Sequence, residues 1–309
     1  MTGVAHGTGR ARGRGVPRLR ARFALAATTC ALAVVAIRCA GRVVGPGGDL
    51  RVLSTDTAFT SGGVRIAVER VAPPGGGRRP AILVLHPSDG VAGSGASYVR
   101  RYAQELASHG YVAYVVHYFD RTGDTRTDDP REDAEFRVWT STLEDAITFA
   151  QHDPAVNPAR VGVFGYSLGA WMGLALGAED RRVGAVVGIG SGFFDALRPT
   201  VRRLPPTLLL HGQDDDVVPL AKALAVDSTL RRLGVVHELV VYPGQKHGFD
   251  DAKDPDARAR TLRFFDRELR PRRFFAFGRR PAAARAGGSA PAESTRAGAA
   301  TGAAAGQRP

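Results

Sequence analysis

The middle of the chain alternates regularly between short apolar runs and longer amphipathic stretches, and this constrains the fold most. Apolar runs of about four to eight residues are typical of strands that are buried on both faces. Such runs lie at residues 81–85, 111–118, 160–164, 183–189, 207–210 and 235–241. Between them, apolar residues at three- and four-residue spacing predict helices at 97–108, 133–152, 168–176, 219–233 and 256–269. The pattern predicts an α/β fold with a mostly parallel, doubly wound sheet and helices on both faces.

Charge is concentrated at the two ends of the 309-residue chain, whose formal net charge is +12. Residues 1–49 hold eight Arg and one Asp, residues 271–309 hold seven Arg and one Glu, and residues 50–270 are nearly neutral. A basic groove built into the fold is therefore not expected, and no nucleic-acid partner is predicted. Because 44% of the residues are hydrophobic, a wholly disordered chain is excluded.

Composition divides the chain into three parts. Residues 1–45 are Arg-rich and contain an apolar run at 23–37, which predicts a signal peptide or a membrane anchor with possible membrane contact. The domain would then be secreted, or anchored facing outside the cytoplasm; a mis-called start codon would make the protein cytoplasmic. Residues 50–270 form the predicted folded domain, and 271–309 an Ala/Gly/Pro/Arg tail expected to be disordered. Both cysteines lie in the first part, so the domain has no thiol nucleophile.

The sequence Gly165-Tyr166-Ser167-Leu168-Gly169 lies between a predicted strand and a predicted helix. A serine at such a tight turn projects its hydroxyl above the sheet, and the following helix N-terminus directs amide groups toward a developing oxyanion. The alternative is a glycine-rich turn with an incidental serine. The strand before it and the helix after it favour Ser167 as a nucleophile.

Two further loops hold the partners that a serine nucleophile needs. Three consecutive aspartates, 214–216, follow one strand, and His247 follows the next. Either loop alone would be interpreted as solvated surface. Together with Ser167 they give the chain order Ser, Asp, His, with each residue just past the carboxyl end of a strand, as in an α/β-hydrolase triad.

The chain resembles the dienelactone hydrolase family over roughly residues 58–270. The motifs that carry the resemblance are GYSLG at 165–169, HGQDDDVVP at 211–219, YPGQKHGF at 242–249, HPSDG at 86–90 and HYFDRTG at 117–123. The resemblance implies that Asp215 is the acid and His247 the base. It also implies an oxyanion hole formed by the backbone amides of Ser88 and Leu168. The implied activity is hydrolysis of a small-molecule ester or lactone through an acyl-enzyme, without a metal or an organic cofactor.

The chain departs from that family at two positions. Dienelactone hydrolases proper use a cysteine nucleophile, where this chain has Ser167, and a glutamate where it has Pro87. A serine esterase branch of the family is therefore expected. Two alternatives stay open: a serine peptidase or other acyl hydrolase on the same triad, and an inactive, membrane-tethered binding protein. Oligomeric state is not indicated by the sequence.

The substrate pocket is predicted only in outline. About seventeen residues separate the strands at 183–189 and 207–210, so no large cap domain is expected. The apolar pocket candidates are Tyr118, Tyr166, Trp171, Phe193 and Phe194, although for Trp171 a place in the core is favoured over the pocket. Two arginines could bind a substrate carboxylate or could pair with Asp124 and Asp128; these are Arg121 and Arg126. His86 and His211 are expected to bond loop backbone rather than to titrate in the reaction.

Overall fold

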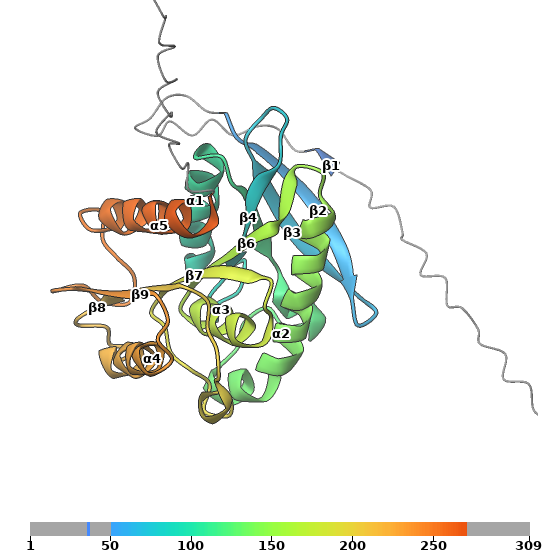
Figure 1. The fold of residues 1–309 in the computed structure, drawn as a ribbon. Coiled ribbons are helices and arrows are strands. Elements are labelled where there is room, and N and C mark those ends of the chain that lie inside the picture. The colour runs from blue at the N-terminus through green and yellow to red at the C-terminus, as the bar shows by residue number, and fades with distance from the viewer. Residues whose placement is uncertain (1–35, 38–50, 271–309) are drawn as a thin grey trace, which may run out of the picture. The chain divides into compact units, whose positions relative to one another are not determined.

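A single twisted sheet organises the chain in the computed structural model, which describes residues 36–37 and 51–270 (Figure 1). Its strands are β1 (Ala36–Ile37), β2 (Leu53–Ser61), β3 (Val64–Ala72), β4 (Arg79–Leu85), β5 (Val112–Val116), β6 (Val156–Tyr166), β7 (Val183–Ile189), β8 (Thr207–Gly212) and β9 (His237–Tyr242). They pair in the order β1-β2-β3-β5-β4-β6-β7-β8-β9. Pairs from β5 to β9 are parallel, and those from β1 to β5 through β2 and β3 are antiparallel.

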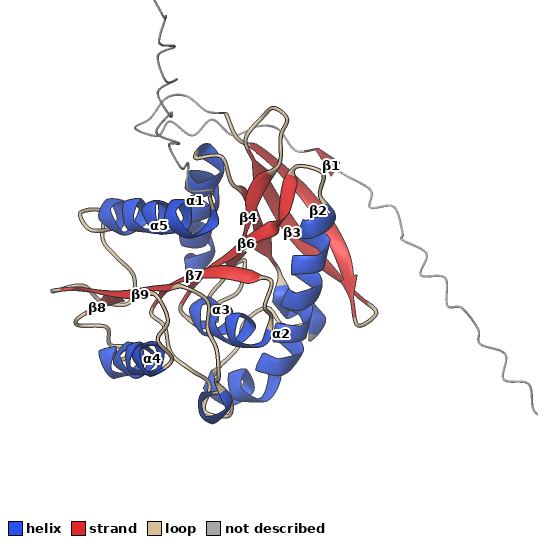
Figure 2. Cartoon of the chain, in the orientation of Figure 1, coloured by secondary structure: helices blue, strands red, loops and turns tan. Residues whose placement is uncertain are grey.

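Helices cover both faces of this sheet (Figures 1 and 2). They are α1 (Ser94–Ser108), α2 (Asp129–His152), α3 (Leu168–Glu179), α4 (Leu220–Arg232) and α5 (Asp254–Leu269). Buried residues of α2, α3 and α4 share one hydrophobic core, and those of α1 and α5 share the other. The predicted α/β-hydrolase architecture is therefore confirmed.

The predicted elements differ from the observed ones mainly where polar residues mask the pattern. β2 was not predicted, because its sequence LSTDTAFTS is mostly polar and only Thr57 and Ser61 are buried in it. Helix α2 begins at Asp129 rather than at residue 133. Its start is fixed by Asp128, whose carboxylate accepts a hydrogen bond from the Arg131 amide, and by a proline in the first turn.

The parallel strands bring their carboxyl ends to one edge of the sheet, where the loops after β4, β6, β7, β8 and β9 meet. The loop from β7 to β8, residues 190–206, contains one short 3₁₀ helix, Arg198–Thr200, and no other regular element. The expected absence of a large cap holds for this described loop, so side chains of the core domain line the site.

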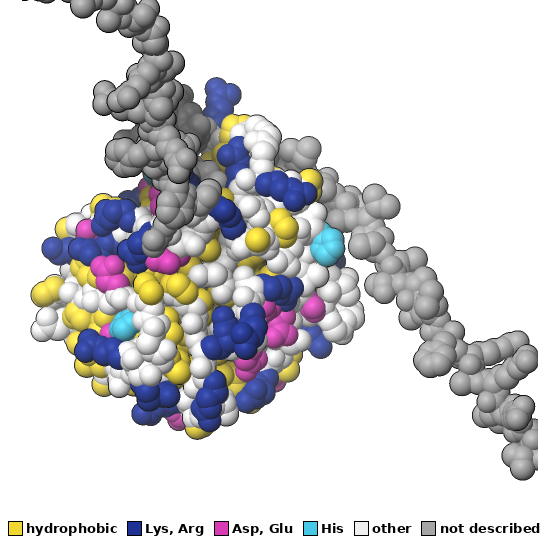
Figure 3. Space-filling model, viewed as in Figure 1, with side chains coloured by type: hydrophobic (Ala, Val, Ile, Leu, Met, Phe, Trp, Pro, Cys, Tyr) yellow, Lys and Arg dark blue, Asp and Glu magenta, His cyan; other side chains and the backbone are white. Residues whose placement is uncertain are grey.

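Surface charge on the described domain is mixed. On the face shown in Figure 3, basic side chains are interspersed with acidic ones.

Several expectations concern residues outside the described range. The rest of the predicted signal or anchor segment at 23–37 and the tail at 271–309 lie there, whereas Ala36–Ile37 pair with β2. No helix among the described residues is long and apolar enough to cross a membrane.

Candidate active site

Ser167 lies at a sharp backbone bend between β6 and α3. It has a φ of 55° and a ψ of −126°, and it is the only non-glycine residue with positive φ among those described. A non-glycine residue in such a conformation costs on the order of 1–3 kcal/mol and is found mostly at functional sites. Here the strained bend holds a serine at the carboxyl end of the sheet.

Two glycines make this bend possible. A Cβ atom at Gly165 would lie 2.1 Å from the carbonyl oxygen of Gly169, and one at Gly169 would lie 2.3 Å from the carbonyl oxygen of Leu85. These contacts are with backbone atoms, which cannot move aside as a flexible side chain can. The amide of Ser167 donates to the carbonyl of Ile189 at 2.8 Å, so the bend is also tied to β7.

Asp215 and His247 form a buried, hydrogen-bonded pair. His247 Nδ1 lies 2.9 Å from Asp215 Oδ2 and 3.1 Å from Oδ1, and the aspartate side chain is 1% exposed. The amides of Val217 and Val218 donate to Oδ1 at 3.0 and 2.8 Å. Because an ionised carboxylate only accepts hydrogen bonds, Nδ1 carries the proton and Nε2 is the basic nitrogen of the ring.

The aspartates on either side of Asp215 face solvent. Asp216 is exposed and pairs with Lys246 at 2.9 Å, which lowers the pKa of its carboxyl group, and Asp214 is also exposed. Of the three consecutive aspartates, Asp215 is the one that reaches His247.

Tyr166 connects the serine bend to the histidine loop. Its hydroxyl donates to the carbonyl of His247 at 3.2 Å, and the two ring centroids lie 5.1 Å apart. Gly190 lies against the imidazole, since a Cβ there would be 3.0 Å from His247 Cε1.

No hydrogen bond joins Ser167 Oγ to His247 within the described residues. Hydrogen bonds between catalytic groups are often long without substrate and tighten when it binds.

The two predicted oxyanion-hole residues lie beside the serine. Leu168 is the first residue of α3, and Ser88 lies in the loop after β4. Both line the same pocket as Ser167. The Ser88 carbonyl accepts a hydrogen bond from the Thr127 amide at 2.9 Å, and the Asp89 carboxylate accepts one from the Gly95 amide at 2.9 Å, so the loop is held in place.

His86 and His211 hydrogen-bond to loop backbone, as expected from the sequence. His86 Nδ1 lies 2.9 Å from the Pro87 carbonyl, and His211 Nε2 lies 2.8 Å from the Val218 carbonyl. Both side chains are fully buried. Burial lowers the pKa of His86 to about 3 and also lowers the pKa of His211, so both rings are neutral.

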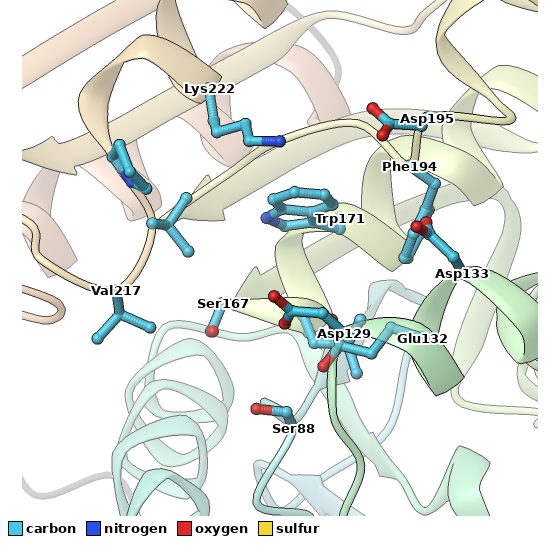
Figure 4. Close-up of a pocket in the computed structure, with 13 residues that line it drawn as sticks. Ser88, Asp129, Glu132, Asp133, Ser167, Trp171, Phe194, Asp195, Val217 and Lys222 are labelled. Carbon is cyan, nitrogen blue, oxygen red and sulfur yellow. The ribbon is translucent and has the colours of Figure 1, made fainter.

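A pocket of about 350 Å³ opens above Ser167 (Figure 4). It is lined by Ser88, Asp129, Glu132, Asp133, Ser167, Leu168, Trp171, Phe194, Asp195, Val217, Val218, Pro219 and Lys222. Its walls come from the start of α2, the start of α3, the loop after β7 and the segment from β8 into α4. Its volume suits a small molecule.

The aromatic residues of the pocket are only partly those expected. Phe194 lines it, whereas Phe193, Tyr118 and Tyr166 are not among its lining residues. Tyr118 is fully buried and donates to the His86 carbonyl at 2.7 Å. Trp171, for which the core is favoured over the pocket, has both places: it packs against the core, and its indole lines the pocket and donates to the Gly190 carbonyl at 3.2 Å.

The predicted roles of Arg121 and Arg126 are not supported. Neither side chain lines the pocket, so neither is placed to bind a substrate carboxylate there. Asp124 is paired instead with Arg131 at 2.8 Å.

The sequence reasoning missed the charged wall of the pocket, formed by Asp129, Glu132, Asp133, Asp195 and Lys222. Burial, with the nearby carboxylates of α2, raises the pKa of Glu132 to about 7. The run of acidic residues at 128–133 was a signal in the sequence, but its position opposite Ser167 depends on how α2 packs. Among the described residues, no group of three or more His, Cys, Asp or Glu could hold a metal ion.

Comparison with known sequences places the chain among the dienelactone hydrolases. The profile of the dienelactone hydrolase family matches residues 67–268. A Synechocystis protein whose name assigns it provisionally to the carboxymethylenebutenolidases is 26% identical over 209 residues, which cover 60% of this chain and 82% of that protein. A Methylorubrum extorquens protein named in the same way is 28% identical over 211 residues, covering 63% of this chain and 71% of the relative.

Solved structures share the fold. The dienelactone hydrolase from Anabaena variabilis superimposes with a TM-score of 0.55 at 22% identity, covering 71% of this chain and 99% of that one. The dienelactone hydrolase-like promiscuous phosphotriesterase P91, from metagenomic libraries, gives a TM-score of 0.59 at 18% identity, with coverage of 71% and 99%.

Proposed function

Because the chain belongs to the dienelactone hydrolase family and is a carboxylic ester hydrolase, we propose that it cleaves a small-molecule ester or lactone through Ser167, His247 and Asp215. The observation that carries the proposal is the buried Asp215–His247 pair at the same sheet edge as a serine in a strained strand-to-helix bend. Neither feature is needed for the fold alone, and each has a cost that a purely structural role would not offset.

In the first half of the proposed reaction, His247 Nε2 takes the proton from Ser167 Oγ as this oxygen attacks the substrate carbonyl carbon. Asp215 keeps the imidazole in the required tautomer and stabilises the imidazolium that forms. The tetrahedral intermediate collapses, His247 gives its proton to the leaving alcohol, and the acyl group stays on Ser167.

In the second half, water attacks the acyl-enzyme with His247 again as the base. The acid is released, and the proton returns to Ser167 Oγ. For a lactone, the leaving alcohol belongs to the same molecule as the acyl group, so ring opening yields a single hydroxy acid.

The amides of Ser88 and Leu168 are proposed to stabilise the oxyanion in both halves. Leu168 is at the N-terminus of α3, where backbone amides have no partner inside the helix and the helix dipole favours negative charge. Loss of one such donor costs about 3–4 kcal/mol in a well-studied serine hydrolase.

The proposal is tested with full-length protein and p-nitrophenyl esters from acetate to octanoate. Turnover should depend on acyl-chain length, because the pocket of about 350 Å³ limits the group it accepts. Ser167→Ala should abolish turnover and labelling by a fluorophosphonate, whereas the exposed-serine control Ser97→Ala should retain both. Equal rates from wild type and Ser167→Ala would remove Ser167 as the nucleophile.

A further inference from the structure

The pocket above Ser167 carries an unbalanced charge. Four of its lining residues are carboxylic acids, and one, Lys222, is a base. Because these charges surround the place where the proposed function puts the substrate, they bear on which substrate the pocket accepts.

The four acids have no ion-pair or hydrogen-bond partner for their carboxylates within the described residues. They are Asp129, Glu132 and Asp133, which come from the first turns of α2, and Asp195, which comes from the loop after β7. Two other acids near this helix are paired, Asp124 with Arg131 at 2.8 Å and Glu179 with Arg137 at 3.5 Å. The pocket acids are thus left available to a ligand.

The carboxylates would not define a binding site on their own. Their significance comes from the cavity they share with Ser167, where an ester must lie if the proposed function is correct. Figure 4 shows Asp129 and Glu132 projecting from α2 into the space between Ser88 and Trp171. A substrate group extending from the reacting carbonyl would meet this wall.

The same pocket already holds one cation against an aromatic ring. The Lys222 ammonium lies 5.4 Å from the centroid of the Trp171 ring, within the range of a cation–π interaction. Lys222 is exposed, so its side chain can move away at little cost. The indole face and the carboxylates together are suited to an organic ammonium group.

A metal ion is a poorer occupant. Three acids of the wall lie on α2 and one lies in the loop after β7. They do not form a group of three or more side chains that could hold a metal ion, and no such group occurs elsewhere in the described residues. Carboxylates spread around a cavity fit a group with diffuse charge better than a small ion that requires converging ligands.

We propose that the substrate is an ester carrying a positively charged nitrogen, whose ammonium group lies against Asp129, Glu132 and Asp133. This proposal rests on the proposed function, because the ester must be held above Ser167. Lys222 offers the opposite possibility, a substrate carboxylate, and the experiment is designed to separate the two.

The test compares three esters of one acid with full-length protein at pH 8. Butyrylcholine carries a quaternary nitrogen, 3,3-dimethylbutyl butyrate has the same shape without charge, and 4-butyryloxybutanoate carries a carboxylate. We expect kcat/KM for butyrylcholine to exceed that for the neutral ester by about tenfold, which corresponds to several weak solvent-exposed charge interactions. Raising the salt from about 0.02 to 0.5 M should reduce this ratio.

Substitutions test whether the charged residues of the pocket cause the preference for the cationic ester. The triple variant Asp129→Asn/Glu132→Gln/Asp133→Asn should reduce the ratio to about one, and Lys222→Met should increase it. Glu135→Gln, on the same helix but outside the pocket, should leave all three rates unchanged. The salt dependence and Lys222→Met test the proposal even if the triple variant does not fold.

The outcomes separate this proposal from the proposed function. Equal kcat/KM for the cationic and neutral esters would overturn the cation preference while leaving the esterase intact. Preference for the anionic ester, abolished by Lys222→Met, would overturn it in favour of a carboxylate substrate. Turnover of the neutral ester that survives Ser167→Ala would instead contradict the proposed function.

Discussion

The two sides of the candidate site differ in how their carboxylates are satisfied. Asp215 is buried and accepts hydrogen bonds from two backbone amides and from His247. Across the pocket, Asp129 and Asp133 are exposed and have no partner within the described residues. A buried carboxylate needs partners inside the protein, and these partners fix its position. An exposed carboxylate is solvated by water and stays accessible to a ligand. Under the proposed function, the first arrangement would hold the base in place and the second would select the substrate.

The largest effect is expected when the charge of the buried carboxylate, Asp215, is removed. Asp215→Asn should lower kcat on p-nitrophenyl esters by about 10³–10⁴-fold, because the amide holds the imidazole in the wrong tautomer, as in the Ser-His-Asp enzymes where this change has been made. Asp216→Asn is the matched control, since this neighbour faces solvent and should change kcat little. A comparable loss in both variants would show that the acid has been assigned to the wrong aspartate.

Packing around the histidine gives the next largest effect. Gly190→Ala places a methyl group 3.0 Å from His247 Cε1 at a φ of +69°, so the ring must shift. We expect kcat to fall by up to about 100-fold, because small displacements of a catalytic group are costly. The free energy of unfolding, measured with urea, should fall by about 1–3 kcal/mol.

Gly234→Ala is the control that separates backbone strain from contact with His247, the two effects expected of Gly190→Ala. Its φ is +66°, but a Cβ there has no atom within 4 Å. It should reduce the free energy of unfolding by a similar strain while leaving kcat unchanged. An equal loss of kcat in both variants would mean that strain, rather than contact with His247, lowers activity.

The acidic wall of the pocket should make the preference for the cationic over the neutral ester depend on pH. Three acids at the start of α2 lie near Glu132: Asp128, Asp129 and Asp133. From other elements, the buried Tyr118 and the charged pocket residues Asp195 and Lys222 face it. Since the pKa of Glu132 is about 7, the wall gains a negative charge as the pH rises through 7. The butyrylcholine to dimethylbutyl butyrate ratio of kcat/KM should rise a few-fold between pH 6 and pH 8.

Taking this ratio at each pH cancels changes in His247 that affect both esters. Glu132→Gln should flatten the pH dependence of the ratio. A ratio that still rises to the same extent in this variant would place the titrating group elsewhere.

The smallest expected effect is on stability. Folding raises the pKa of Glu132 from its usual value of 4.5 to about 7, so the folded state binds this proton more tightly than the unfolded state does. The resulting stabilisation is present below about pH 4.5 and is lost as the pH rises through 7. Glu132→Gln should therefore raise the melting temperature by a few degrees at pH 8 and by less at pH 5. An equal rise at both pH values would contradict a raised pKa.

Much of the fold follows from local patterns. The apolar runs at β4 to β8 indicate strands buried on both faces, and helices at intervals between them favour a parallel sheet. For β9 the expected burial on both faces is wrong, because this strand ends the sheet order and five of its six residues are only partly buried. β2 escaped prediction because a strand that is largely exposed keeps polar residues, and its place is decided by pairing with β3. For Trp171 the sequence favours the core, because the residue lies on the helix four positions after Ser167, and the sequence does not show where that helix leaves an opening.

The sequence by itself indicated the α/β class and the bend at Ser167, because apolar runs, helical spacing and the GYSLG motif can each be recognised in a short stretch of the chain. Glycines at 165 and 169 and the strand before them are enough to predict the turn. The resemblance in the HGQDDDVVP motif had already pointed to Asp215, whereas tertiary structure decided how deeply Asp215 is buried and which acids line the pocket of Ser167. Asp215 meets His247 across 32 positions, and Glu132 meets Ser167 only because α2 and α3 pack on the same face of the sheet. Burial and electrostatics depend on such distant contacts, which no short sequence pattern contains.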